Sequence, residues 1–368
     1  MDMLNRAAEI KRRCRRFVSH DRPARPAEAL RELAAYAGDC EADKYNSGEL
    51  VERLERRVAH LLGKEAVAYM PSGKLAQLAA LRVLADRAGC RRVAMHPRSH
   101  FEEYELRAYQ ELWSMTAASF GGYDRLPTPV DLRGITEKLG ALTLEMPLRR
   151  LGCVLQPWDE LVEISQQARR RGIALHLDGA RIWESQPHYG KPFAEIAALF
   201  DTVYVAFDKG LGGLAGAALA GSGPMIEEAR VWQRRAGGRA LRSFPYLLSA
   251  LKGLDERLPR MADYHERAVA IAAALRTLPR VRVSPDPPHA NAFHVIVEGA
   301  CDRAREAALG ISEETGVWLF DDPVDCPIQG LAMFEITVRE AAFELTIDEI
   351  RDVVGRFVEA LPSGSGAR

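Results

Sequence analysis

The sequence has few cysteines, almost no net charge and no long apolar run, and each absence excludes a class of protein. The six cysteines among 368 residues stand apart, without the spacing of a metal site or a disulfide framework. The net charge is −1, so no overall field attracts nucleic acid. No run reaches the roughly 18 apolar residues that cross a membrane, and an apolar signal core is missing. We therefore expect a cytoplasmic protein that binds neither nucleic acid nor membrane.

The composition is that of a globular chain with two domains. Hydrophobic residues make up 47% and charged residues 27% of the sequence. Short apolar runs alternate with helical periodicity over residues 45–255, which predicts an α/β domain with a mostly parallel central sheet and helices on both faces. Residues 256–368 read as a smaller α+β domain, and residues 1–44 as an N-terminal helix and connector.

The N-terminal helix carries a basic run. Five of the six residues from 11 to 16 are Lys or Arg. Such a run suits either nucleic-acid binding or an exposed, solvated helix. The rest of the chain offers no matching basic face, so we expect the exposed helix.

Two apolar runs end in charged residues, in HLDGAR (176–181) and VAFDKGLGG (205–213). We expect Asp178 and Lys209 to be buried at the carboxyl ends of their strands. A lysine amine forms a Schiff base with the aldehyde of pyridoxal 5′-phosphate (PLP). An acid paired with the pyridine nitrogen keeps that ring an electron sink. The pair therefore indicates a PLP site, the alternative being two ordinary strand-end charges.

Two further strand ends carry polar residues. Ser72, Gly73 and Lys74 follow the apolar strand 66–70 and begin a helix. The N-terminus of a helix readily binds phosphate. Ser72 can equally be a simple helix cap. His100 follows the strand 92–95, where its ring can stack on a flat cofactor or serve the structure alone. Ligands of parallel sheets bind beyond the carboxyl ends of the strands. We therefore expect one shared site that contains Ser72, His100, Asp178 and Lys209.

With HLDGAR and DKGLGG the chain resembles the threonine aldolase / β-eliminating lyase family of fold-type-I PLP enzymes, as a divergent member. The segments YNSGELVERLERRVAHLLGKEAVAYMPSGK (45–74), HPRSHFEEYE (96–105) and GGRALR (237–242) extend the resemblance. It covers residues 17–255 well and the C-terminal third loosely. The resemblance implies a PLP-bound homodimer or homotetramer with active sites shared between subunits, and an amino acid as its small-molecule substrate.

The resemblance also implies roles for individual residues. Lys209 would form the Schiff base, Asp178 would hold the ring nitrogen and His100 would stack on the ring. The other implied contacts are those of Ser72, Gly73, Lys74 and Arg242 with the cofactor phosphate, of Arg181 with a carboxylate or cofactor oxygen, and of Ser19 and Arg339 with the substrate carboxylate.

The chain departs from the family pattern mainly at residues that direct the reaction. Leu148 stands where the family has a histidine that can handle a hydroxyl proton. Glu335 stands where a carboxylate-binding arginine is usual, and Arg339, which we expect on the same strand face, can compensate. Lys74 replaces a threonine of the phosphate turn, and Asp208 precedes Lys209 where a small hydroxyl residue is common.

Three functions stay open from the sequence. The first is cleavage of a β-hydroxy-α-amino acid by retro-aldol chemistry through the Lys209 Schiff base, with His100, His20 or a water as base. The second is another PLP reaction, such as β-elimination, decarboxylation or racemisation, which Glu335 favours because it repels a substrate carboxylate. The third is a non-catalytic scaffold, which retention of both Asp178 and Lys209 disfavours.

Overall fold

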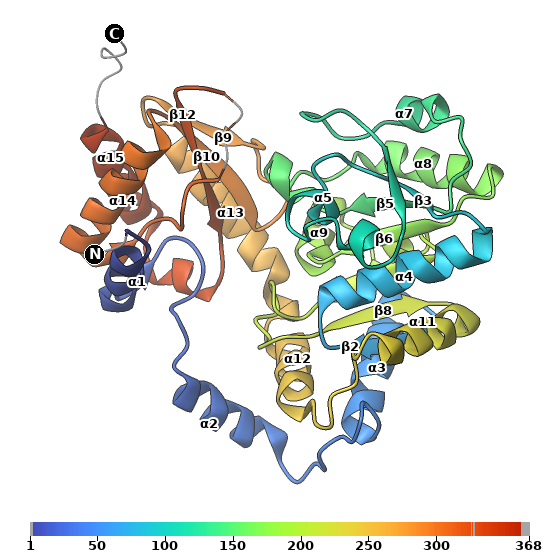
Figure 1. Cartoon of the computed structure of the whole chain (residues 1–368). Helices are drawn as coiled ribbons and strands as arrows, with labels where there is room; N and C mark the ends of the chain where they lie inside the picture. The colour runs from blue at the N-terminus through green and yellow to red at the C-terminus, as the bar shows by residue number, and fades with distance from the viewer. Residues whose placement is uncertain (1–2, 325, 327, 362–368) are drawn as a thin grey trace. The chain divides into compact units, whose positions relative to one another are not determined.

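The computed structural model describes residues 3–324, 326 and 328–361, which form two compact units (Figure 1). The larger unit is Ala27–Arg260, and the smaller unit joins the residues up to Pro26 to those from Met261 onward. These boundaries differ from the predicted ones, because the start of the chain is no separate connector. Helix α1 (Met3–Arg13) is tied to α14 (Cys301–Thr315) by ion pairs, and β1 (Arg16–Phe17) pairs in parallel with β11 (Val317–Trp318).

A seven-stranded sheet forms the centre of the larger unit. Only β8 runs antiparallel to its neighbours, β7 and β2, so the predicted mostly parallel sheet is confirmed for the described residues. The central strands are buried on both faces, as their uninterrupted apolar sequences predict. In spatial order the strands are β2 (Ala66–Met70), β8 (Ala217–Gly221), β7 (Thr202–Ala206), β6 (Leu175–Gly179), β5 (Ala141–Glu145), β3 (Arg92–Met95) and β4 (Thr116–Ser119).

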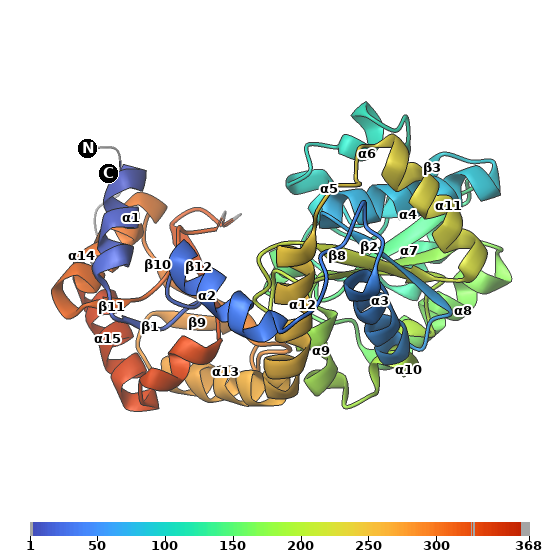
Figure 2. The same cartoon turned by 90° about the horizontal axis from the view of Figure 1, so that it is seen from below.

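Helices cover both faces of this sheet, and α3 and α4 lie on opposite sides of β2 and β8 (Figures 1 and 2). Helix α3 buries an apolar stripe that includes Leu54 and Val58 and ends where Gly63 adopts φ 59°. The helices are α2 (Pro26–Ala37), α3 (Glu49–Leu62), α4 (Gly73–Ala88), α5 (His100–Glu103), α6 (Ala108–Glu111), α7 (Pro129–Gly134), α8 (Trp158–Arg170), α9 (Ile182–Tyr189), α10 (Phe193–Ala197), α11 (Gly223–Arg235) and α12 (Phe244–Glu256).

The smaller unit is built on an antiparallel sheet in the order β12-β10-β9. Phe293, Val295, Phe334 and Phe357 belong to the core between this sheet and its helices. The strands are β9 (Val281–Ser284), β10 (Ala292–Glu298) and β12 (Leu331–Thr337), and the helices besides α1 and α14 are α13 (Met261–Leu275) and α15 (Ile347–Ala360). Thr346 and Glu349 form a capping box at the start of α15. Across the described parts of both units, no helix is long and apolar enough to cross a bilayer.

Candidate active site

The central sheet places two acids and a phenol side by side at the carboxyl ends of three strands. Glu145 of β5 is in register with Asp178 of β6, and Asp178 is in register with Tyr204 of β7. Residues in register on neighbouring strands point to the same face, with their strands about 4.8 Å apart. We call Glu145, Asp178 and Tyr204 the acid row. Its members are largely buried, and Asp178 is only 2% exposed.

Burial makes the two carboxyl groups of the acid row hard to ionise together. Burial, with the charge of Glu145 as the next cause, raises the pKa of Asp178 from 3.8 to about 7. Burial also raises the pKa of Glu145, although its oxygens accept the N–H groups of His100 at 2.9 Å and Arg149 at 3.2 Å. No ion pair with lysine or arginine reaches Asp178 in the described part of the chain. A bound cation beside Asp178 would therefore relieve an unfavourable charge.

His100 follows β3, and a buried carboxylate fixes its ring. The Nδ1 atom lies 2.8 Å from Oε1 of Glu105, whose side chain is fully buried, and Gln77 donates to the same oxygen at 3.3 Å. A carboxylate accepts hydrogen bonds, so Nδ1 carries the hydrogen and Nε2 remains for a ligand. The ring stacks on Tyr104 with centroids 5.2 Å apart.

The same contacts set the charge of His100. Burial alone lowers the pKa of His100, but the hydrogen bond that its ring donates to Glu105 and the charges of Asp178, Glu105 and Glu145 outweigh burial, so the pKa is raised. The ring is therefore a stronger base than a free histidine, at the edge of the acid row.

Lys209 lies beyond β7 in a tight turn. The prediction from the sequence that Lys209 is buried was wrong. Its side chain is 38% exposed, and its Nζ atom lies 2.9 Å from the carboxylate of Asp208. The turn is held by Gly212, which donates to the Lys209 carbonyl at 2.9 Å, and by buried Glu184, which accepts the Gly210 N–H at 2.8 Å. The strand ends at Ala206, so Lys209 projects from the edge of the sheet, where an amine can react.

The predicted phosphate turn lies between β2 and α4. The Ser72 hydroxyl accepts the Leu75 N–H at 3.4 Å, so the capping role is confirmed, and the turn precedes a helix of 16 residues. The Lys74 ammonium instead donates to the Tyr104 carbonyl at 3.4 Å, in the segment that carries His100. Because β2 runs parallel to β7, this turn lies at the same edge of the sheet as Asp178 and Lys209.

These groups fit PLP. Lys209 offers an amine to the aldehyde, Asp178 offers an unpaired buried carboxylate to a protonated ring nitrogen, and His100 offers a flat ring. The first turn of α4 leaves backbone N–H groups that suit a phosphate. The described residues contain no cluster of three or more His, Cys, Asp or Glu that could hold a metal ion.

Three other predicted or flagged positions of the larger unit have defined surroundings. Arg181 is the N-cap of α9 and lies close enough to Glu145 for their charges to interact. Arg242 donates to the carbonyl of Asp43 at 2.9 Å, so the GGRALR segment is tied to the loop before α3. Leu148 is 2% exposed and forms a β-bridge, which makes it part of the core.

The predicted substrate contacts of the smaller unit are engaged inside that unit. The Ser19 hydroxyl accepts the Thr337 N–H at 3.0 Å and lies 3.0 Å from Nδ1 of His20. Glu335 is 7% exposed and accepts the Thr337 hydroxyl at 3.1 Å. Arg339 does not share a strand face with Glu335, because β12 ends at Thr337. That expectation was wrong because strand alternation does not continue past the end of a ladder.

The sequence analysis missed Glu105 and Tyr204. Tyr204 could have been noticed as an aromatic residue with a polar tip in the buried strand TVYVA, five residues before Lys209. Glu105 is one of three glutamates in HFEEYE, and only the turn that follows α5 decides which of them meets His100.

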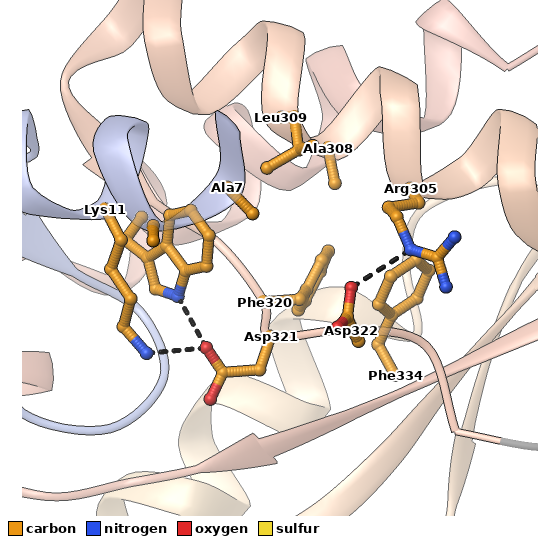
Figure 3. A pocket seen from close by; sticks show the side chains of 11 residues that line it. Ala7, Lys11, Arg305, Ala308, Leu309, Phe320, Asp321, Asp322 and Phe334 are labelled. Carbon is orange, nitrogen blue, oxygen red and sulfur yellow. Dashed lines mark hydrogen bonds and ion pairs between the residues drawn. The ribbon is translucent and has the colours of Figure 1, made fainter. Parts of the chain in front are cut away.

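A cavity of about 190 Å³ in the smaller unit offers a contrast to the candidate site (Figure 3). Its floor includes Phe320 and Phe334, and its charged groups are already paired. Lys11 donates to Asp321 at 2.6 Å, and Arg305 donates to Asp322 at 3.0 Å. Burial would raise the pKa of Asp321, but the bond from Lys11 and nearby positive charges lower it. The protein itself therefore supplies the ion-pair partners of Asp321 and Asp322.

Comparisons with known proteins identify the family of the chain. The sequence matches the family model of beta-eliminating lyases over residues 19–299. It is 29% identical over 276 residues to the low specificity L-threonine aldolase of Escherichia coli, covering 70% of this chain and 78% of that protein. It is 26% identical over 313 residues to low-specificity L-threonine aldolase 1 of Arabidopsis thaliana, covering 81% and 86%. The solved structure of a "putative L-allo-threonine aldolase" from Listeria monocytogenes superposes with a TM-score of 0.90 at 35% identity, over 97% of this chain and 99% of that one.

Proposed function

The chain belongs to the threonine aldolase / β-eliminating lyase family of PLP-dependent lyases, and on that premise we propose that it cleaves the Cα–Cβ bond of a β-hydroxy-α-amino acid. The observation that carries this proposal is the His100–Glu105 pair beside the acid row. Retro-aldol cleavage needs a base for the β-hydroxyl proton, and this pair supplies one. The products are an aldehyde and a smaller amino acid.

Lys209 and Asp178 hold the cofactor in this proposal. When bound, PLP supplies an electron-poor ring that accepts the electrons of the broken bond at Cα. The Lys209 amine would hold the cofactor aldehyde. Asp178 keeps the ring nitrogen protonated, and the positive ring nitrogen in turn relieves the cost of ionising this buried acid.

His100 is the proposed base for the substrate hydroxyl. Glu105 holds the hydrogen of Nδ1, so Nε2 can accept the hydroxyl proton as the Cα–Cβ bond breaks. General-base assistance contributes about 10²–10⁴-fold to a rate. The buried apolar Leu148 cannot share this task, so we expect cleavage of threonine to be slow. Because Glu335 repels a substrate carboxylate, we expect a bulkier or cationic substrate to be preferred.

The test is product analysis with the PLP-loaded protein. L-threonine and L-allo-threonine should release acetaldehyde and glycine, and Lys209→Ala should abolish that release. Lys191→Ala is the matched control, because Lys191 lies in the same unit and its ammonium pairs with Glu195 and lies over the ring of Trp158. Release of a keto acid and ammonia without acetaldehyde would instead support β-elimination. The residue that favours this second candidate is Leu148, since elimination needs no base at that position.

We also propose a homodimer or homotetramer that works in the cytoplasm. The support is Arg242, which the family resemblance assigns to a phosphate across a subunit boundary and which, within its own chain, donates to Asp43 and Leu241 carbonyls. Sedimentation of the PLP-loaded protein tests this, and a fully active monomer would contradict it.

A further inference from the structure

Tyr204 directs its hydroxyl at the first residue of α4. A Cβ atom added to Gly73 would collide with the Tyr204 hydroxyl and would lie 2.6 Å from the ring carbon Cζ. The phenol therefore occupies the space that any other residue at position 73 would need. The side chain is 95% buried, and it projects from the same face of the sheet as Asp178. A glycine at position 73 is thus explained by the approach of Tyr204.

The Tyr204 hydroxyl lacks a hydrogen-bond partner within the described residues, and so do the N–H groups of Gly73 and Lys74 beside it. Ser72 satisfies only the N–H of Leu75 in this first turn. Tyr204 is only 5% exposed, so few partners other than a bound ligand or a water can reach its hydroxyl. A phenol donor and two backbone donors thus converge at the N-terminus of a 16-residue helix.

The charges nearby keep Tyr204 a donor. Burial and then the negative charges of Asp178, Asp208 and Glu105 raise the pKa of Tyr204 far above its usual value. The phenol therefore stays protonated and can only offer its hydrogen to an anion. The positive charge of Arg181 acts in the opposite direction, and its effect on the pKa is smaller.

We propose that the Tyr204 hydroxyl, with the N–H groups of Gly73 and Lys74, binds the phosphate of the cofactor. This inference rests on the proposed PLP-dependent function and adds a residue to the phosphate seat. Tyr204 acts by hydrogen bonding to a doubly charged group, so its removal weakens binding of the phosphate and leaves the rest of the cofactor untouched.

Binding of PLP and of pyridoxal, which lacks the phosphate, separates this contact from all others. The apo-protein is titrated with each compound, and the dissociation constant is read from the visible absorption of the bound form. Tyr204→Phe should raise the dissociation constant of PLP about tenfold or more and that of pyridoxal less than twofold. The inhibition constant of inorganic phosphate against PLP binding should be about tenfold lower in the wild-type protein than in Tyr204→Phe.

Tyr69→Phe is the matched control. Tyr69 is 1% exposed, its hydroxyl is buried without a hydrogen bond, and its ring approaches Gly216, the residue just before β8, rather than Gly73 of α4. This variant should bind both compounds within twofold of wild type.

Three outcomes overturn the inference. Equal weakening of PLP and pyridoxal in Tyr204→Phe would mean that the hydroxyl contacts the ring, and unchanged binding of both would mean that it contacts neither. Wild-type protein that binds no PLP would overturn the proposed function together with this inference, and that failure is visible before any variant is made.

Discussion

Asp178 in the larger unit and Asp321 in the smaller unit are acids in opposite states. Asp321 is half-exposed, accepts hydrogen bonds from Lys11 and Trp318, and has a lowered pKa. Asp178 is buried, has no cationic ion-pair partner in the described residues, and has a pKa raised to about 7. The protein thus supplies Asp321 with a positively charged partner, whereas the described residues supply none to Asp178. We infer that Asp178 is built for a bound cation and Asp321 for stability.

The largest effect is expected at Lys209, because this residue would hold the cofactor whose positive ring nitrogen pairs with Asp178. Lys209→Ala should remove the borohydride-reducible visible band of bound PLP and all measurable lyase activity, with the fold retained, because the amine that holds the cofactor is gone. Circular dichroism checks the fold. A variant that keeps a reducible band would show that another lysine holds PLP.

Exchanging both acids for amides tests the comparison directly. Asp178→Asn should retain PLP but lose most activity, about 10²-fold or more, because the ring nitrogen is no longer held protonated. Asp321→Asn should keep its activity and lower the melting temperature, because it removes the partner of Lys11. Near-normal turnover in Asp178→Asn would mean that this acid is only structural.

The two acids should also respond to pH with opposite signs. Between about pH 4 and pH 7 the unfolded state has lost the Asp178 proton and the folded state keeps it, so the free energy of unfolding of the apo-protein falls as pH rises. The lowered pKa of Asp321 gives stability that is present above its unfolded pKa and is lost on acidification. Between pH 5 and pH 8 the melting temperature of apo Asp178→Asn should depend less on pH than that of the apo wild-type protein. An unchanged slope would contradict the raised pKa.

A smaller effect is expected at Glu105, which positions His100. Glu105→Gln removes a negative charge, so the pKa of His100 should fall and the acid limb of the kcat/KM profile should move to lower pH, with about a tenfold loss at the plateau. Glu102→Gln is the control, since Glu102 contacts Arg107 and Tyr109 instead. A loss of activity without a shift of the limb would indicate a purely structural role.

The smallest effects are expected at the positions that depart from the family. Leu148→His and Glu335→Arg should each raise the rate of threonine cleavage severalfold, if these residues limit the reaction. Because Leu148 is 2% exposed, the histidine should also lower the melting temperature, which is measured alongside. Rapid release of acetaldehyde from threonine by the wild-type protein would show that neither position matters.

Much of the larger unit could be predicted from local patterns. The apolar stripe and the stop at Gly63 predict α3 with its observed bounds, because helix periodicity is written in neighbouring residues. Ser72 and His100 each follow a strand, Asp178 lies near the carboxyl end of one, and the carboxyl ends of parallel strands share one edge of the sheet. Their convergence therefore follows from strand order alone.

The sequence by itself determined the fold class and the family, since each depends on short segments, and it supplied the roles proposed for Lys209 and Asp178. Tertiary structure alone decided that Asp178 is in register with Glu145 and Tyr204, that Glu105 is the glutamate that meets His100, and that Tyr204 reaches Gly73. It also decided that the first strand of the chain pairs with β11. These contacts join residues on separate strands and helices, or single out one of several equivalent side chains. Register, burial and the resulting pKa values arise only when the sheet assembles and excludes water.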